Sequence, residues 1–473
     1  MDKFNALLNN TVSAINGVLW NSILIYVLIA VGLWFTYRLG AVQLRLFIHM
    51  FQVLIGSQKS NKEGISSFQA LATSLAARVG TGNVAGVAVA ITLGGPGAVF
   101  WMWTIALLGM ATGFAESTLG QFYKVKDAHG EFRGGPAYYI RMGLNNSWLA
   151  LAFSVCLLFG YGLVFSAVQA NTIGDALHYA YNIKPLYSGL VMTIVTGMIV
   201  IGGLRSIARF SELVVPFMCL AYVGMALLIV AMNIEQVPAI FMLIIKSAFG
   251  IEQAAGGFLG AALNGIKRGL YSNEAGSGSV PHAAAAATPY PPHPVSQGLV
   301  QMLGVFVDTL IICSCTAIII LLATGGHLEQ GVAGIRLTQD AMVSHVGAWG
   351  MDFIAITLVF FAFTSVVANF AYAESNLHIF KLDNRIGYSV MISCYLAMVL
   401  WGTLAPLPTV WNMADMALGF MTVINIIAIV LLTKTVMMLL NDYLQQRKEG
   451  KIPTFKLNKQ HEYQGKTEPG VWD

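Results

Sequence analysis

The chain has 473 residues, of which 56% are hydrophobic and only 10% are charged. Soluble globular domains carry about 25% charged residues, so this composition excludes an ordinary soluble protein. The formal net charge of +4 does not call for a nucleic-acid partner, because the basic residues gather in loops on one side of the predicted membrane segments. Apolar runs recur along nearly the whole chain, each long enough at about 20 residues to cross a bilayer core of about 30 Å.

The pattern predicts an all-α polytopic membrane protein with eleven spans. The first span runs from about Trp20 to Tyr37, and the amphipathic stretch Gln43–Ile55 is expected at the membrane interface. The short segment 236–249 is too mixed to span and predicts a helix on the outer surface. The other ten spans are expected near 65–94, 95–117, 148–174, 185–203, 210–233, 255–289, 294–323, 351–378, 385–403 and 411–437.

The charges in the loops predict an orientation in the membrane. With the N-terminus outside, the inner loops hold Arg38, Arg45, Lys59, Lys62, Lys124, Lys126, Arg133, Arg141, Arg205, Arg209, Lys381, Arg385, Arg447, Lys448 and Lys451. The outer loops hold little beyond Lys3, Lys184, Lys246 and Arg336. By the positive-inside rule, this bias predicts an outside N-terminus and a cytoplasmic C-terminus.

Two glycine-flanked breaks, Gly80–Val84 and Gly276–Val280, interrupt hydrophobic segments in corresponding positions of the two halves of the chain. Hydrocarbon cannot satisfy the backbone groups that a broken helix frees, so such breaks must be buried in protein or line a wet cavity. Glycines that only allow close helix packing are the simpler interpretation of each motif taken alone. A matched pair instead favours a substrate and ion site near the membrane midplane of a secondary transporter.

The placement of the breaks predicts the domain organisation. After the first helix, ten helices divide into two groups of five, and each break lies in the first helix of its group. Because five is odd, the groups have opposite orientations, as in inverted-repeat transporters. The stretch Asn264–Gly269 could also belong to the second irregular region. The predicted divisions are an extra N-terminal region at 1–60, repeats at 61–235 and 236–440, and a cytoplasmic tail at 441–473.

Five segments together resemble one transporter family. They are Gly94–Trp103, Ala77–Val87, Phe132–Tyr139, Ser272–Ser279 and the pair Arg447-Lys448. Over nearly the full chain, the sequence resembles the sodium:alanine (or glycine) symporter family of the amino acid–polyamine–organocation superfamily. The resemblance implies a leucine-transporter-type 5+5 fold with one extra N-terminal helix, in the cell membrane. It also implies sodium-driven uptake of a small neutral amino acid such as alanine or glycine, with sodium as a co-transported ligand. Apart from the resemblance, we expect no cofactor and a monomeric chain.

The first break supplies a candidate cradle for the substrate carboxylate. Half-helix N-termini direct free amides at anions, and glycine lets the backbone approach closely, which points to Gly80, Thr81, Gly82 and Asn83. A helix terminus contributes only about 0.3–2 kcal/mol, so a bound cation is expected to assist.

Backbone carbonyls near Ala76, Ala77 and Val79 are suitable ligands for sodium at the end of the first half-helix. Thr364 and Ser365 place two hydroxyls in the eighth core helix. The family resemblance implies that they complete the sodium site. Without it, bonding of both hydroxyls back to their own helix is the better interpretation.

Other polar side chains are candidates for the substrate site. Gln169 on the third core helix is an amide in an apolar stretch, and Ser277 and Ser279 flank the second break as candidates for the ammonium group. Gln169 could equally tie helices together. The pocket is expected to be small, with Phe165, Phe363 and Trp411 as lids.

Ionisable residues at membrane depth point to function. Asp308 could take part in ion coupling or form a structural ion pair with Arg78 or Arg268, and Arg78 is expected in a polar network. Glu274 could pair with Arg268. Interfacial positions are expected for Glu116, Glu374 and Asp415, with a gating role open for Asp415, and a solvated loop is expected for His282 and His293.

Four alternatives to sodium-coupled alanine or glycine uptake stay open to different degrees. A proton-coupled transporter would use Asp308 as the proton carrier, and a glutamine-preferring transporter would have the same fold. An integral-membrane enzyme is disfavoured, because the sequence has no His-Glu-x-x-His or Gly-x-Ser-x-Gly motif. A channel is disfavoured because paired breaks suit a binding site better than a pore.

Overall fold

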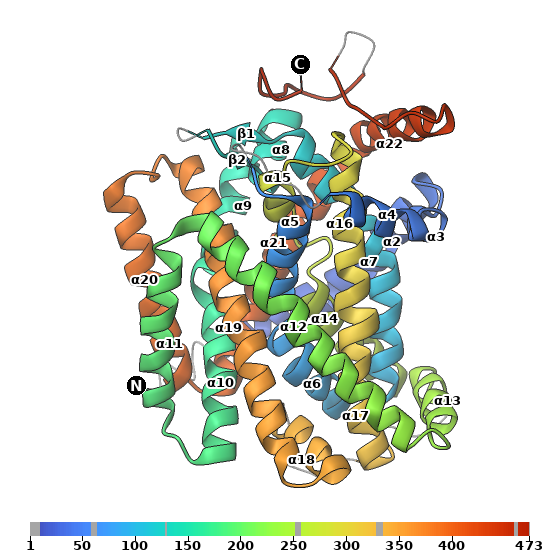
Figure 1. Cartoon of the computed structure of the whole chain (residues 1–473), viewed down its shortest axis with the longest axis vertical. Helices are drawn as coiled ribbons and strands as arrows, with labels where there is room; N and C mark the ends of the chain where they lie inside the picture. The colour runs from blue at the N-terminus through green and yellow to red at the C-terminus, as the bar shows by residue number, and fades with distance from the viewer. Residues whose placement is uncertain are drawn as a thin grey trace.

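The computed structural model describes residues 10–57, 64–127, 130–250, 257–327, 334–457 and 462–472. Lys3, Lys59 and Lys62, used in the charge argument, lie outside these residues. Long helices run roughly along the vertical axis of Figure 1, with short elements at both ends. The upper end, here called the C-terminal face, carries α8 (Pro136–Gly143), α22 (Thr433–Lys448) and the antiparallel strands β1 (Val125–Lys126) and β2 (Phe132–Arg133). The lower end carries α13 (Val237–Ala248) and α18 (Ile335–Val346).

Eight helical segments of the described chain are long and apolar enough to cross a membrane. They are Asn10–Arg38 (η1 Gly17–Leu24 and α2 Ile25–Arg38), α7 (Gly97–Phe122), Ser147–Tyr181 (α9 Ser147–Phe159, η3 Gly160–Val164 and α10 Phe165–Tyr181), Ser206–Met232 (within α12, Gly203–Met232), Pro294–Thr324 (α16 Pro294–Val305, η4 Phe306–Cys313 and α17 Ser314–Thr324), Trp349–Phe380 (α19 Trp349–Leu377 and η5 His378–Phe380), α20 (Arg385–Leu404) and α21 (Leu407–Leu431). The chain is therefore a multi-pass membrane protein, as predicted.

The predicted count of eleven spans is not confirmed by helix length and composition. A bent pair, α5 (Ser67–Arg78) with η2 (Gly82–Gly86) and α6 (Val87–Gly94), supplies a ninth span. The two remaining predicted spans are α11 (Pro185–Val200), which has 16 residues, and the interrupted pair α14 (Gly257–Asn273) and α15 (Pro281–Ala286). Helix α11 is shorter than a straight crossing requires, and the pair α14 and α15 is interrupted by the second break.

Several elements were not expected from the sequence. The β1–β2 hairpin, α8 and α18 are too short or too polar to give a membrane signal. The last predicted span, 411–437, ends earlier than expected, because α21 stops at Leu431 and α22 begins separately at Thr433. The short segment 236–249 forms a helix, α13, as predicted, and its location on the outer surface stays a prediction.

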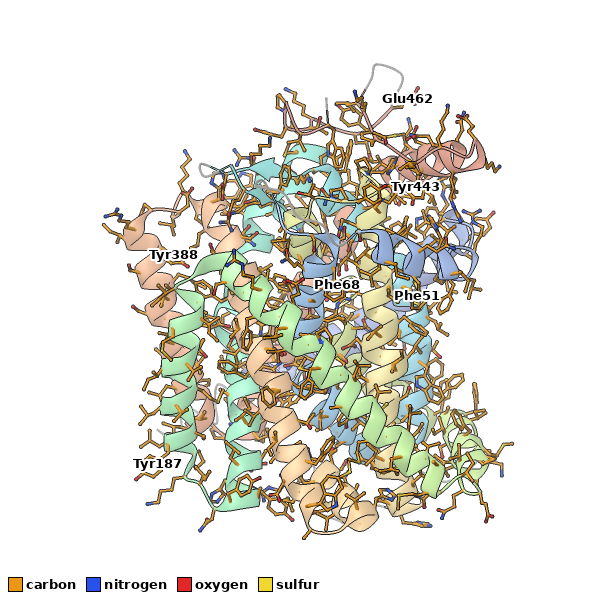
Figure 2. The ribbon with its side chains drawn as sticks, viewed as in Figure 1. Phe51, Phe68, Tyr187, Tyr388, Tyr443 and Glu462 are labelled. Atoms are coloured by element: carbon orange, nitrogen blue, oxygen red, sulfur yellow. The ribbon has the colours of Figure 1, made fainter. Side chains whose placement is uncertain are left out.

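The predicted interfacial stretch forms α3 (Val42–Arg45) and α4 (Phe47–Gly56) near the C-terminal face. Ile48 and Ile55 of α4 are exposed, as an apolar face against lipid would be. His49 Nε2 lies 2.9 Å from the hydroxyl oxygen of Tyr443 and ties α4 to α22. Figure 2 shows Phe51 and Tyr443 at this same end of the molecule.

Helix α14 packs directly on α7. A Cβ on Gly265 would overlap the Ala98 carbonyl oxygen, and one on Gly269 would lie 2.6 Å from Ile105 Cγ2. These two glycines are four residues apart on one helix face, the small-residue spacing that brings membrane helices together. The stretch Asn264–Gly269, left open by the sequence, is thus helical and lies within α14.

Candidate substrate and ion site

The first predicted break is present between α5 and η2, where the two half-helices meet at 51°. The Gly80 amide donates to Asn83 Oδ1 at 2.9 Å, and the Thr81 amide donates to Gln169 Oε1 at 2.9 Å. Two amides of the predicted cradle are therefore engaged by side chains. A substrate carboxylate must replace the Gln169 oxygen to reach the Thr81 amide.

Asn83 joins the first break to η4. Its Nδ2 donates to Asp308 Oδ1 at 2.7 Å, while the hydroxyls of Ser272 and Thr309 donate to Asp308 Oδ2 at 2.8 and 2.7 Å. Asp308 is fully buried. The carboxylate thus lies beside the predicted cradle among neutral donors, and its direct hydrogen bonds go to these groups and not to Arg78 or Arg268, the ion-pair partners considered from the sequence.

Five oxygen atoms gather where α19 meets the first break. Ser365 Oγ lies 2.8 Å from the Ala76 carbonyl oxygen, 3.4 Å from that of Val79 and 3.1 Å from that of Phe361. Thr364 Oγ1 lies 2.9 Å from the same Phe361 oxygen. A serine hydroxyl has one proton to donate, so the cluster holds more acceptors than its protons can satisfy. Neutral oxygens from an unwound helix are the ligands that transporters present to sodium.

The Thr364 hydroxyl donates to its own helix, at Phe361 O. This is the back-bonded arrangement that the sequence left open beside the sodium role. The hydroxyl oxygen of Thr364 nevertheless belongs to the same oxygen cluster as Ser365 Oγ, because both contact the Phe361 carbonyl oxygen. The sodium role of Thr364 stays a prediction.

The second break lies between α14 and α15, where Glu274, Gly276 and Gly278 have left-handed φ angles of 59°, 91° and 85°. The Ser277 hydroxyl donates to the Glu274 carbonyl oxygen at 2.7 Å, and the Ser279 hydroxyl donates to Glu274 Oε2 at 2.7 Å. Both candidate serines are therefore held by Glu274 of their own loop. Figure 1 shows α5 above α6 and α14 below α15, so the two broken helices run in opposite directions.

Glu116 belongs to this second break, and the predicted interfacial position for it is wrong. The residue is fully buried, because α7 continues to Phe122 beyond the predicted end at 117. Its carboxylate accepts hydrogen bonds from the Gly276 amide at 3.0 Å, the Gly278 amide at 3.2 Å and Asn425 Nδ2 at 2.7 Å. The position of an acidic residue inside an apolar segment could have indicated from the sequence that Glu116 binds groups in the protein interior.

A small cavity of about 10 Å³ lies between the two breaks. Such a volume holds about one water molecule, so the walls must move before an amino acid enters. In the part of the chain that the structure describes, Arg78 Nε, Arg78 Nη2 and Asn369 Oδ1 are buried without a hydrogen-bond partner. Unpaired buried polar atoms are rare and mark a place where a polar ligand would be stabilised. The lining residues are Ala77, Arg78, Tyr161, Phe165, Gln169, Tyr271, Glu274, Asn369 and Leu418.

A continuous row of aromatic rings borders this cavity. Tyr161 contacts Phe165 with ring centroids 4.6 Å apart, Phe165 lies 5.9 Å from Tyr271, and Tyr271 lies 4.8 Å from Trp411. Of the expected lids, Phe165 lines the cavity, and Trp411 lies behind Tyr271, one ring away from it. The third, Phe363, packs on another ring, that of Phe210, at 6.0 Å.

Beyond the aromatic row, Asp415 pairs with two cations of α14. Its Oδ2 lies 2.7 Å from Arg268 Nη2 and 2.6 Å from Lys267 Nζ. The Arg268 guanidinium also lies 4.5 Å from the Trp411 ring centre. The considered pairing of Arg268 with Glu274 is therefore wrong, because Glu274 lies past the end of α14 on the cavity side. Asp415 is 1% exposed, and the interfacial position predicted for it is wrong as well.

The two histidines expected in a solvated loop are buried. His282 Nδ1 lies 2.7 Å from the Ser279 carbonyl oxygen, and its Nε2 lies 2.9 Å from Asn376 Nδ2. His293 is fully buried and accepts a hydrogen bond from the Val295 amide. The prediction is wrong because His282 lies in α15 and His293 caps α16, and both helix ends are inside the protein.

Comparison with known proteins decides the family. Residues 5–457 match the sodium:alanine symporter family. The chain belongs to this family. It is 46% identical to the uncharacterized transporter YaaJ of Escherichia coli strain K12, over 98% of each chain. It is also 46% identical to the probable sodium/glutamine symporter GlnT of Bacillus subtilis (95% of this chain, 93% of GlnT) and 40% identical to a sodium/proton-dependent alanine carrier of Bacillus sp. strain PS3 (86% and 94%).

The fold of this symporter-family chain is that of leucine-transporter-type proteins, as the resemblance implied. The crystal structure of MhsT in complex with L-phenylalanine superposes with a TM-score of 0.59, covering 81% of this chain and 93% of MhsT at 15% identity. At that identity the likeness concerns the fold alone. Family and fold are those of secondary transporters, which are not enzymes.

For a family member with this oxygen cluster, we expect Ser365→Ala to raise the half-saturating sodium concentration by about tenfold or more, because it removes an oxygen that contacts both half-helix carbonyls. Thr364→Val is expected to raise it as well, by a smaller factor. The measurement is alanine uptake against sodium concentration at fixed membrane potential.

Thr193→Val is the matched control, because the Thr193 hydroxyl donates to Gly189 O within α11, away from the break. An unchanged sodium dependence in Thr364→Val would remove Thr364 from the proposed ion site, and an unchanged value in Ser365→Ala would remove the site itself.

Proposed function

We propose that the protein is a sodium-coupled symporter that imports a small neutral amino acid, alanine or glycine, by alternating access. The observation that carries the proposal is the joint position of the oxygen cluster and the cavity. Ala76 and Val79 supply carbonyl oxygens to the cluster, while Ala77 and Arg78 between them line the cavity. Ion and substrate would therefore bind on one turn of the chain, which couples them directly.

The chemistry of the cavity suits a zwitterion. Arg78 offers two buried N–H groups to a carboxylate, and Asn369 Oδ1 and the Glu274 carboxyl group can accept from an ammonium group. Gln169 is placed to exchange its bond with the Thr81 amide for a bond to the substrate. Ser277 and Ser279 would act through Glu274, which they bind. The aromatic walls leave little room for a long side chain.

One sodium ion is sufficient to drive uptake. Moving one positive charge through 100 mV releases about 2.3 kcal/mol. A tenfold sodium gradient adds about 1.4 kcal/mol, and together these would support an accumulation of several hundredfold.

We further propose that the C-terminal face is cytoplasmic and the N-terminus outside, in the cell membrane. Elements rich in lysine and arginine gather at this face (Figure 1), where they include Arg133 of β2, Arg141 of α8, and Arg447 and Lys448 of α22. One chain carries both breaks, so the proposed site needs no second copy, and we propose that a monomer transports.

A competition panel in proteoliposomes tests the function. With an inward sodium gradient, we expect labelled alanine to accumulate, unlabelled alanine and glycine to compete, and glutamine not to compete. Replacement of sodium by choline at fixed pH is expected to abolish accumulation. The readout is labelled alanine retained in the liposomes.

The names of two relatives suggest alternative coupling ions or substrates, and the same competition panel tests both alternatives. Accumulation that survives choline and follows a proton gradient would replace the sodium proposal by proton coupling through Asp308, the group suited by its burial to carry a proton. Competition by glutamine with no competition by alanine or glycine would overturn the substrate assignment in favour of the specificity named for GlnT.

A further inference from the structure

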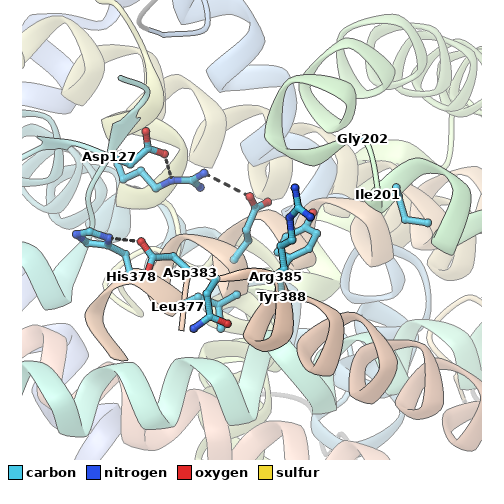
Figure 3. Close-up of a pocket in the computed structure, with 11 residues that line it drawn as sticks. Asp127, Ile201, Gly202, Leu377, His378, Asp383, Arg385 and Tyr388 are labelled. Atoms are coloured by element: carbon cyan, nitrogen blue, oxygen red, sulfur yellow. Dashed lines mark hydrogen bonds and ion pairs between the residues drawn. The ribbon is translucent and has the colours of Figure 1, made fainter. Parts of the chain in front are cut away.

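A cavity, here called the vestibule, opens at the C-terminal face, away from the proposed site. It has a volume of about 390 Å³ and lies between the β1–β2 hairpin, the end of α19 and the start of α20 (Figure 3). Its lining includes the charged side chains Asp127, Arg133, Glu374, Asp383 and Arg385. His378 Nδ1 lies 2.9 Å from Asp383 Oδ2, and this contact lowers the pKa of Asp383. The cavity is large enough for a hydrated amino acid.

A second small cavity, of about 10 Å³, lies between this vestibule and the proposed site and is bordered by Arg133 and Tyr372. Arg133 lines both the vestibule and the small cavity, so its side chain forms the wall between them. Tyr372 lines the small cavity, and its ring lies 5.3 Å from that of Tyr161, which lines the substrate cavity. The three cavities therefore follow one another from the first break to the C-terminal face, separated by a tyrosine pair and by Arg133.

Arg133 separates the small cavity from the vestibule and is held in place by two carboxylates. Its Nε donates to Asp127 Oδ2 at 2.8 Å within the hairpin, and its Nη2 donates to Glu374 Oε1 at 3.3 Å on α19 (Figure 3). The side chains of Arg133 and Glu374 are only 13% and 11% exposed, so the contact is shielded from solvent although it lies near the C-terminal face. Because the guanidinium fork binds two partners, the longer contact to Glu374 can open while Asp127 keeps the charge paired.

We propose that Arg133 is a latch: opening of its contact with Glu374 joins the small cavity to the vestibule and releases the transported solute at the C-terminal face. The vestibule is then the exit chamber of the carrier, and Arg133 is a positioning residue that controls access to it. The identity of the solute rests on the proposed function, whereas the latch itself does not.

Sided thiol labelling tests the latch without any transport. Ala371, which lines the small cavity, is replaced by cysteine as a reporter, and a membrane-impermeant thiol reagent is applied from the side of α22. The labelling rate of the reporter is taken as the increase over the rate of the otherwise identical protein that keeps Ala371. In this reporter, Arg133→Gln and Glu374→Gln are each expected to speed labelling by about tenfold, the effect that loss of a charge-assisted hydrogen bond has on an equilibrium. Glu374→Gln is the sharper variant, because it leaves the Arg133–Asp127 bond in the hairpin intact.

Arg141→Gln is the matched control, since Arg141 is an exposed arginine of α8 at the same face. It is expected to leave the labelling rate within about twofold. Unchanged labelling in Glu374→Gln, or equal acceleration by Arg141→Gln, would overturn the latch. Acceleration from both membrane sides would also overturn it, because general loosening and not a one-sided gate would then be the cause. Failure of sodium-driven alanine uptake leaves these results unaffected and bears on the proposed function only.

Discussion

Replacing Asn83 with alanine is expected to lower sodium-dependent alanine uptake by about 100-fold or more while the protein still folds and inserts. The side chain accepts from the Gly80 amide and donates to Asp308, so its loss leaves a buried amide and a buried carboxylate each short of a partner. Each such loss corresponds to about a tenfold effect or more. Uptake into proteoliposomes, normalised to the amount of inserted protein, gives the measurement.

Asn264→Ala supplies the control for this variant. The Asn264 amide donates to Gly260 O of its own helix, so its removal should leave uptake nearly unchanged. Normal uptake by Asn83→Ala would count against the first break as the substrate cradle, whatever the behaviour of the control.

Gly80→Ala is expected to abolish transport. The Gly80 backbone lies outside the left-handed region, so the residue is needed for space and not for its φ angle. A Cβ there would lie 2.8 Å from Gln169 Oε1 and closer still to Ser365 Oγ. It would therefore displace the two side chains that link the break to α10 and α19. Both uptake and sodium-dependent protection against heat denaturation should be lost.

Gly86 of the same broken helix offers a matched comparison. A Cβ at Gly86 would meet its nearest atoms, Thr81 O and a carbon of the Trp411 ring, at 3.7 Å, an ordinary contact distance. Gly86→Ala should keep uptake within about twofold, since alanine is tolerated wherever helix backbone and space allow. Transport by Gly80→Ala at the Gly86→Ala level would refute the close approach of α19 to the break.

The sequence predicted the first break and its surroundings well, because glycines in a membrane helix leave a local signal. The position of Ser365 beside Ala76 and Val79 followed from the family resemblance, and the structure places these residues together. The ligand roles themselves remain predictions. Element limits at the C-terminal face were less predictable, since α8, α18 and the hairpin are short and mixed in composition.

Burial explains most of the errors. Glu116, His282 and Asp415 were placed near helix ends or in loops, where water would solvate them, yet each is at most 4% exposed. Their partners, such as the Gly276 amide, the Asn376 side-chain amide and Arg268, come from segments far away along the chain. A pattern of hydrophobicity reports local periodicity and carries no information on such long-range pairings.

The anchoring of the second break by Glu116 makes the two mirrored helices chemically unequal. A fixed carboxylate belonging to the protein already occupies the Gly276 and Gly278 amides, the place where a free anion would otherwise dock. Binding of a substrate carboxylate to backbone amides is thereby confined to the first break, and the Gly276–Gly278 backbone is fixed to α7. Substitutions at equivalent positions of the two breaks should therefore differ in effect, with loss of affinity at the first break and loss of rigidity at the second.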